Sequence, residues 1–214
     1  MRLDYLKDPA AIYRLSFETV RREVDLSGFP AKEAEVAVRL IHACGMPEIF
    51  GDLKFSAGAI ETAARALAAG APVLCDCRMV AAGISLGATG LANPVLGFLD
   101  HPELAGRAKA ENTTRSAAQV PLWRDHQAGA VIAIGNAPTA LFRLIEEIQA
   151  GAPMPAAVLG FPVGFVGATE SKQALVNATP EIPHATLLGR RGGSAMAAAA
   201  VNAIARIAAG SSQT

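Results

Sequence analysis

The sequence predicts an α/β fold on the evidence of three features. Short apolar runs alternate five times with helical patterns over residues 72–209. The run VIAI at residues 131–134 has no polar alternation, which is typical of a parallel strand covered on both faces. Alanine and glycine are abundant and only 5% of the residues are aromatic, which favours helices packed closely on a sheet. We therefore expect three α/β/α layers around a five-stranded, mostly parallel, doubly wound sheet of flavodoxin-like order.

The length and the net charge of the chain limit how many domains and which binding partners we expect. The 214 residues contain no Pro/Gly/Ser-rich linker, so we expect one domain over 1–214, with a helical N-terminal part to about residue 70 packed on the α/β core. The 19 basic and 19 acidic residues cancel, which argues against binding nucleic acid or a membrane surface through bulk charge. Because no long apolar run and no signal-peptide core are found, we expect a cytoplasmic protein.

The three cysteines predict neither a disulfide framework nor a metal site. Cys75 and Cys77 alternate on an expected strand and Cys44 lies elsewhere, so there is no CxxC pair and no zinc-type spacing. We expect reduced thiols and no bound metal.

Asp8 and Pro9 predict the start of a first helix, because an N-cap carboxylate precedes a proline that has no amide to lose. The helix is expected to end near Val24. Ser16 interrupts its apolar row, at a position where a large apolar side chain is usual. Ser16 is either a small packing residue whose hydroxyl bonds the carbonyl one turn back, or a hydroxyl that faces a ligand.

A second helix is predicted over residues 31–44, with Gly45 as its left-handed cap. Glu35, Arg39 and His42 stand four and three residues apart, so they share one polar stripe. The stripe is either a surface ion pair beside a histidine that suits the negative end of a helix, or a place where an arginine and an imidazole meet a ligand.

Further elements are expected in order: a helix over 56–69, a strand over 72–75, a short helix over 79–86 and a strand over 95–99. A polar helical stretch is expected next, in which ENTTRSAAQVPLW at residues 111–123 puts Arg115 just before an apolar turn. Arg115 is either solvated or a clamp for carboxylates.

The strongest local signal is a βαβ unit over residues 130–164. Two apolar runs flank a helix in which Leu141, Leu144, Ile145 and Ile148 recur at helical spacing. The loops GNAPT at 135–139 and FPVGFVG at 161–167 would open at the carboxyl edge of the sheet, where open α/β sheets bind ligands.

A helix from about Ala168, a strand over 185–188 and an alanine-rich helix to about residue 209 are expected to close the fold. The glycines of 160–167 and of GRRGGS at 189–194 would let backbone amides approach a ligand, and helix N-termini favour anions. Neither loop is a Walker loop or a GxGxxG sequence, so the phosphate signal is weak.

Six segments together resemble one family. They are SFETVR (16–21), RLIHACG (39–45), NTTRSAA (112–118), IGNAPTAL (134–141), GFPVGFVGATESK (160–172) and RRGGSAM (190–196). In this order they are similar to the precorrin-8X methylmutases, the family that includes the cobalt-precorrin-8 methylmutases. The resemblance implies an isomerase of cobalamin biosynthesis, which moves a methyl group on a corrinoid ring from carbon eleven to carbon twelve and forms hydrogenobyrinate. In the anaerobic branch the substrate already carries cobalt.

The resemblance also implies roles for particular residues. The histidine of RLIHACG, here His42, would be the catalytic acid, and Ser16 and Arg39 would contact the substrate. We expect further substrate contacts from Arg115, Asn136, Thr139, Gly164, Ser171, Arg190 and Ser194. We expect no catalytic role for Cys77, Arg78 or Arg191. A homodimer with its site near the subunit interface is implied as well.

The implied chemistry suits these residue types. A rigid macrocycle that carries acetate and propionate arms needs an apolar slot rimmed with arginine forks and backbone amides. A concerted methyl shift needs no nucleophile, metal or redox cofactor, so we expect none. An imidazole that shares a proton with a ring nitrogen would draw electron density toward the migration terminus, an acid effect of about a hundredfold to ten-thousandfold.

Two other functions remain open from the sequence. A non-catalytic tetrapyrrole carrier on the same scaffold would bind the ring without isomerising it. A flavin or nucleotide binder is suggested only by the strand order and the glycine loops, and would hold phosphate near Gly135 or Gly164.

Overall fold

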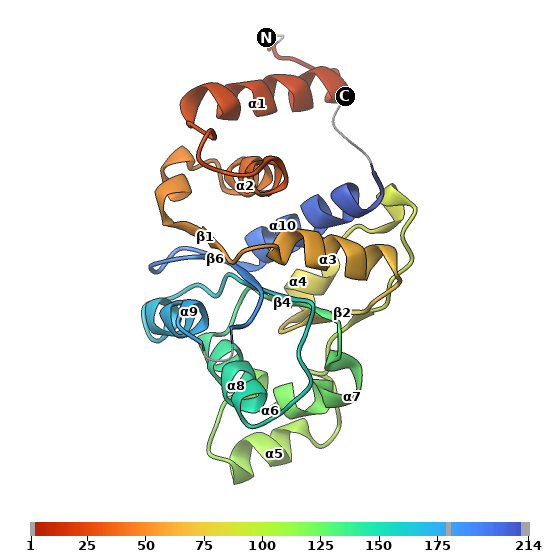
Figure 1. The fold of residues 1–214 in the computed structure, drawn as a ribbon, viewed down its shortest axis with the longest axis vertical. Coiled ribbons are helices and arrows are strands. Elements are labelled where there is room, and N and C mark those ends of the chain that lie inside the picture. The colour runs from red at the N-terminus through yellow and green to blue at the C-terminus, as the bar shows by residue number, and fades with distance from the viewer. Residues whose placement is uncertain (1–2, 179–180, 211–214) are drawn as a thin grey trace.

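The computed structural model describes residues 3–178 and 181–210. A six-stranded sheet lies at its centre, in the order β1-β6-β5-β4-β2-β3 (Figure 1). The five strands β2 to β6 pair in parallel. Taken by themselves in sequence, these five strands have the flavodoxin-like order 2-1-3-4-5. The expected α/β class and strand order are therefore confirmed.

All six strands are short. They are β1 (Leu53–Phe55), β2 (Val73–Cys75), β3 (Val95–Leu96), β4 (Val131–Ile134), β5 (Ala157–Gly160) and β6 (His184–Leu187). The expected number of five is wrong, because β1 adds an antiparallel edge strand in which Leu53 pairs with Leu187. β1 also lies inside the N-terminal part that was expected to be helical. Three residues are too few to show a strand period, so only the pairing with β6 reveals this strand.

The two faces of the sheet pack against different helices. On β4, Val131 and Ala133 face one apolar cluster, which includes residues of α3 (Ala59–Ala68) and α10 (Ser194–Ala208). Ile132 and Ile134 face the other, which includes residues of α8 (Pro138–Gln149) and α9 (Ala168–Val176). Alternate side chains of a strand point to opposite faces, so a strand apolar at every position is covered on both sides.

The N-terminal helices form a further layer outside α10. α1 (Pro9–Glu23) begins at the Asp8 N-cap, whose carboxylate accepts hydrogen bonds from two backbone amides. α2 (Ala31–Cys44) ends at Gly45, which has the left-handed φ of 68° expected of such a cap. Figure 1 shows α1 at one end of the molecule, with α2 between it and α10. Buried residues of all three helices belong to the apolar cluster that also covers the sheet, which is how α2 comes to stand over the outer face of α10.

Shorter elements connect these layers. They are η1 (Pro47–Asp52), α4 (Arg78–Gly83), η2 (Gly87–Thr89), α5 (Leu104–Ala110), α6 (Arg115–Ala118), η3 (Val120–Trp123) and α7 (Arg124–Gln127). The expected strand over 95–99 is shortened to two residues. The polar helical stretch expected after it is divided into α5 and α6, and α7 was not foreseen. In the part of the chain described here, no helix is long and apolar enough to cross a membrane.

A buried carboxylate organises the carboxyl edge of the sheet. Asp76 follows β2, and its side chain accepts hydrogen bonds from the amides of Gly135, Asn136 and Ala137 at 2.8–3.0 Å. Gly135 also allows α10 to begin against the end of β4, because a Cβ atom there would lie 2.7 Å from Cα of Ser194. The loop after β4 and the first residue of α10 are therefore held together at this edge.

Lys172 braces the two glycine-rich loops of the same edge. Its ammonium donates hydrogen bonds to the carbonyls of Pro162 at 3.1 Å and of Arg191 at 2.7 Å, and the residue is fully buried. Burial lowers the pKa of Lys172 to about 8. The loops over 160–167 and 189–193 are thus tied to α9 through one side chain.

Candidate active site

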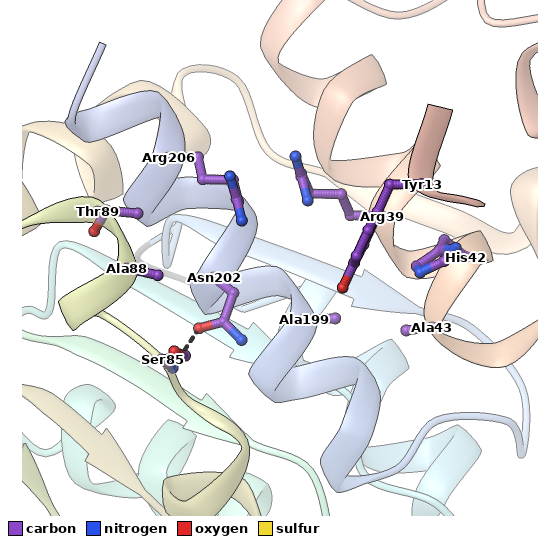
Figure 2. A pocket seen from close by; sticks show the side chains of 10 residues that line it. All are labelled: Tyr13, Arg39, His42, Ala43, Ser85, Ala88, Thr89, Ala199, Asn202 and Arg206. Atoms are coloured by element: carbon purple, nitrogen blue, oxygen red, sulfur yellow. Dashed lines mark hydrogen bonds between the residues drawn. The ribbon is translucent and has the colours of Figure 1, made fainter. Parts of the chain in front are cut away.

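An open cavity of about 270 Å³ lies between α1, α2, α10 and the segment that follows α4. It is lined by Tyr13, Arg39, His42, Ala43, Ser85, Ala88, Thr89, Ala199, Asn202 and Arg206 (Figure 2). Two of the residues expected in the site, Arg39 and His42, are among them. The cavity lies on the outer side of α10, rather than at the carboxyl edge of the sheet where the glycine-rich loops predicted a ligand.

His42 is held by a residue of the neighbouring helix. Nδ1 of His42 lies 2.7 Å from Oγ of Ser16, so α1 and α2 are joined at the site. Because this contact occupies Nδ1, Nε2 is the ring nitrogen left to meet a ligand. His42 itself is exposed to solvent in the last turn of α2, where a helix favours a positive charge. The hydroxyl of Ser16 therefore contacts His42 and not the carbonyl one turn back in its own helix, and Ser16 is not among the residues that line the cavity.

Aromatic rings of α1 pack around the imidazole. The Phe17 ring meets it edge-on with 5.0 Å between centroids, and the Tyr13 ring lies at 5.7 Å. Phe17 is buried, whereas Tyr13 is about half exposed and lines the cavity. The imidazole therefore has one polar partner, two aromatic neighbours and one open side.

Arg39 reaches the cavity from one turn earlier in α2. Its Nε lies 3.9 Å from Oε1 of Glu35, and its guanidinium lies 5.0 Å from the centre of the Phe17 ring. Burial, and then the positive charge of Arg206, lower the pKa of Arg39. The ion pair that the sequence allowed therefore exists. Its arginine is nonetheless part of the cavity and not a surface group, since only 14% of the side chain is exposed.

Asn202 and Arg206 complete the cavity from α10. Oδ1 of Asn202 accepts a hydrogen bond from the amide of Ser85 at 2.7 Å, and its amide group donates to the carbonyl of Gly83 at 2.9 Å. These bonds fasten the segment after α4 to α10 and so shape one wall. Neither residue was predicted from the sequence, although the two stand four apart in an alanine-rich helix, a spacing that puts them on one face.

Three of the remaining expected contacts lie at the carboxyl edge. Arg115 is exposed and donates to the carbonyl of Leu99 at 2.6 Å, and Oγ1 of Thr139 lies 2.7 Å from Oγ1 of Thr114. Asn136 is exposed, and its backbone amide donates a hydrogen bond to the carboxylate of Asp76. None of these three lines the cavity that contains His42.

The other four lie on or near the glycine-rich loops. The amide of Gly164 donates to the carbonyl of Arg190 at 3.2 Å, and the guanidinium of Arg190 lies over the exposed ring of Phe165. Ser194 lies 3.4 Å from the thiol of Cys77 at the start of α10. Ser171 is fully buried, and its hydroxyl donates a hydrogen bond to the carbonyl of Ala168. The hydroxyl therefore lies in the protein interior and not at a surface.

The arrangement is suited to acid–base chemistry on an anionic ligand. It combines one accessible imidazole with two guanidinium groups and a wall of alanines. Over residues 3–178 and 181–210, no group of three or more histidine, cysteine or acidic side chains is placed to hold a metal ion.

Comparison with known proteins gives a consistent result. A family profile described as Precorrin-8X methylmutase matches residues 11–207. The chain is 53% identical over 203 residues to a protein of Pseudomonas aeruginosa named precorrin-8X methylmutase, which covers 95% of this chain and 98% of that protein. It is 37% identical over 195 residues to a cobalt-precorrin-8 methylmutase of Methanothermobacter thermautotrophicus, which covers 90% of each.

A solved structure supports the same relationship. The crystal structure of a precorrin-8X methylmutase from Thermus thermophilus superposes with a TM-score of 0.85 at 42% sequence identity. The match covers 96% of this chain and 99% of that chain. The comparisons favour a methylmutase over the carrier that the sequence left open.

Proposed function

Since the chain belongs to the precorrin-8X methylmutase family, the isomerases that shift a methyl group on the corrinoid ring in cobalamin biosynthesis, we propose that His42 is the acid of this reaction. The substrate is precorrin-8X or its cobalt-containing form. The contact between Ser16 and His42 carries the proposal, because it orients an accessible imidazole in a cavity flanked by arginines.

Ser16 acts in this proposal as a positioning residue. With the hydroxyl oxygen accepting from Nδ1–H, the Nδ1 proton stays in place, and Nε2 becomes the nitrogen that gives and regains a proton. The resemblance implies a substrate contact for Ser16, and the half-buried hydroxyl leaves room for both roles.

The reaction itself is an internal rearrangement. The bond from the methyl group to carbon eleven breaks as the bond to carbon twelve forms, and substrate and product are isomers. A proton shared by His42 with a ring nitrogen must therefore return before the next turnover. While it is shared, it draws electron density out of the ring toward the migration terminus, which lowers the barrier without a covalent intermediate on the enzyme.

The substrate extends beyond the cavity in this proposal. Drug-sized ligands already occupy pockets of about 300 to 1,000 Å³, and a corrinoid with its acetate and propionate arms is larger than such ligands. α10 leads from the cavity, at Ala199, back to Ser194 at the carboxyl edge, a rise of roughly 7 Å along the helix. The proposed contacts for the outer arms are Arg115, Asn136, Thr139, Gly164, Arg190 and Ser194.

A second copy of the chain is proposed to cover α1. Ile12, Tyr13 and Leu15 are 43–54% exposed, and Leu3 and Tyr5 just before the helix are each 65% exposed. Tyr13 also lines the cavity, so a partner on this surface would lie beside the site. Light scattering of the purified protein should give the mass of a homodimer, and Leu15→Glu should shift it toward the monomer. A monomeric unmodified protein would contradict this proposal.

We also place the enzyme in the cytoplasm. All three of its cysteines are unpaired, as is usual in a reducing compartment.

The acid role is tested by His42→Ala and His42→Gln. Conversion of precorrin-8X to hydrogenobyrinate is followed by the visible spectrum, and binding of the product is measured in parallel. We expect the rate at saturating substrate to fall by about a hundredfold or more in both variants, with product still bound. Undiminished turnover in either variant would remove His42 from the mechanism.

A further inference from the structure

Two guanidinium groups meet at one end of the cavity. Arg39 extends from α2 and Arg206 from α10, and Figure 2 shows their side chains pointing toward one another across the gap. Each of the two is partly buried. Like charges brought together inside a partly desolvated cavity repel, so this pairing costs free energy unless an anion lies between them.

The chain supplies little negative charge to this pair. Glu35 is the only carboxylate that the described part of the chain puts within ion-pair distance of either arginine, and it is 3.9 Å from Nε of Arg39. At that separation the two atoms form no hydrogen bond, and both are buried without another partner. The terminal nitrogens of Arg39 and Arg206 make no hydrogen bond to another residue in the described part of the chain, so both side chains can donate to an anionic group that enters the cavity.

Apart from the two arginines, much of the cavity wall is apolar. Three alanines, Ala43, Ala88 and Ala199, line it together with the ring of Tyr13, and His42 lies on the other side of Tyr13 from Arg39 (Figure 2). A flat apolar ring can rest on the alanines only if its charged edge points toward the arginines, because carboxylates pair poorly with an apolar wall.

We propose that Arg206, acting with Arg39, binds one peripheral carboxylate of the corrinoid and so sets the orientation in which the ring reaches His42. The identity of this ligand rests on the proposed function. Two guanidinium forks can together give a carboxylate up to four charge-assisted hydrogen bonds, which fix its direction as well as its position. Arg206 is then a residue that determines binding and orientation, and the chemical step belongs to His42.

The experiment measures binding of the product, hydrogenobyrinate, by titration of its visible spectrum or by calorimetry. The variants are Arg206→Gln, Arg206→Lys, Arg39→Gln and the double variant Arg206→Gln/Arg39→Gln. Arg107→Gln on α5 is the matched control, since it removes the same charge from an exposed helix far from the cavity. Far-UV circular dichroism and thermal unfolding confirm that each variant folds.

We expect Arg206→Gln to raise the dissociation constant by about ten- to a hundredfold, the loss for a charge-assisted hydrogen-bonded pair. Arg206→Lys should lie in between, and Arg107→Gln should bind as tightly as the unmodified protein. If both arginines hold one carboxylate, the double variant should be no more than about threefold weaker than the weaker single variant. Product whose carboxylates are methyl esters should bind equally to the unmodified protein and Arg206→Gln.

Three results would overturn the proposal: a dissociation constant within twofold of the unmodified protein for Arg206→Gln, fully multiplicative losses in the double variant, or an equal loss for the esterified product. The test is separable from that of the acid. If His42→Ala retains turnover while Arg206→Gln weakens product binding, the role of His42 fails and the carboxylate site stands. If His42→Ala loses turnover while Arg206→Gln binds product normally, the role of His42 stands and the carboxylate site fails.

Discussion

The imidazole of His42 and the hydroxyl of Ser16 lie 2.7 Å apart on two different helices, 26 residues from each other in the chain. The side chain that orients the proposed acid therefore comes from α1, which lies outside α2 at one end of the molecule. A change in the packing of α1 on α2 would therefore disturb this hydrogen bond without any change in the sheet.

Ser16→Ala tests that contact directly. We expect the rate at saturating precorrin-8X to fall between about tenfold and a hundredfold, because the ring of His42 loses the partner that holds Nδ1. The Michaelis constant should change less. Ser16→Thr keeps the hydroxyl and should recover much of the rate. Thr19→Ala, which removes a hydroxyl bonded to its own helix at Leu15, is the control and should keep full activity.

Arg39→Ala should weaken substrate binding more than it slows the chemical step. We expect a higher Michaelis constant, by about tenfold or more, because a guanidinium that faces the cavity is lost. The change also leaves the carboxylate of Glu35 partly buried without a counter-charge, so unfolding should require about 1 to 3 kcal/mol less.

Adding Glu35→Gln to Arg39→Ala should restore part of that stability and none of the binding, as measured by urea denaturation and by steady-state kinetics. Arg107→Ala on the exposed side of α5 is the control. A large fall in the saturated rate of Arg39→Ala, with binding intact, would contradict the role given to Arg39.

Asn202→Ala should loosen the wall formed by the segment after α4. The variant loses the acceptor for the amide of Ser85 and the donor to the carbonyl of Gly83, both partly exposed, at a cost of about 0.5 to 1.5 kcal/mol in unfolding free energy. We expect weaker product binding and faster hydrogen exchange at Ser85. Asn177→Ala on α9, which loses only an exposed side-chain contact, should do neither. Unchanged exchange at Ser85 would show that Asn202 does not brace this wall.

Lys172 predicts how stability depends on pH. Its pKa is about 8 in the folded protein, below the ordinary value of 10.5, because burial disfavours the charged ammonium. Between pH 8 and 10.5 the unfolded chain binds more protons at this residue than the folded chain does, so the free energy of unfolding rises with pH in this window.

Comparison with Lys172→Met isolates the effect. Between pH 8 and 10.5 the difference in unfolding free energy between the unmodified protein and the variant should shift in favour of the unmodified protein. It should be constant only below about pH 7, where the amine is protonated in both the folded and the unfolded chain. Denaturant unfolding at a series of pH values measures it. A difference that does not change across this window would mean that the buried amine titrates normally.

Much of the fold follows from short stretches of sequence. The Asp8 cap, the Gly45 cap and the apolar spacing of Leu141, Leu144 and Ile145 each depend on hydrogen bonds or contacts within a turn or two, so their residues alone predict the helices that the structure contains. The five parallel strands and their order were predicted for the same reason, since apolar runs alternate with these helices. The family motifs singled out His42 and Arg39, which the structure places in one cavity.

The remaining features depend on contacts between distant residues, which no local pattern records. β1 forms because Leu53 pairs with Leu187 across the sheet. A three-residue strand is too short for its alternation of side chains to be recognised in the sequence. The position of the cavity outside α10, the bond from Ser16 to His42 and the approach of Arg206 to Arg39 were likewise decided by how α1 and α2 pack on the core. The sequence singled out most of the residues that are proposed to carry the chemistry, but not Asn202 or Arg206. Tertiary packing decided which of them meet, because the burial of apolar helix faces that brings them together is non-directional and is not recorded in any local pattern.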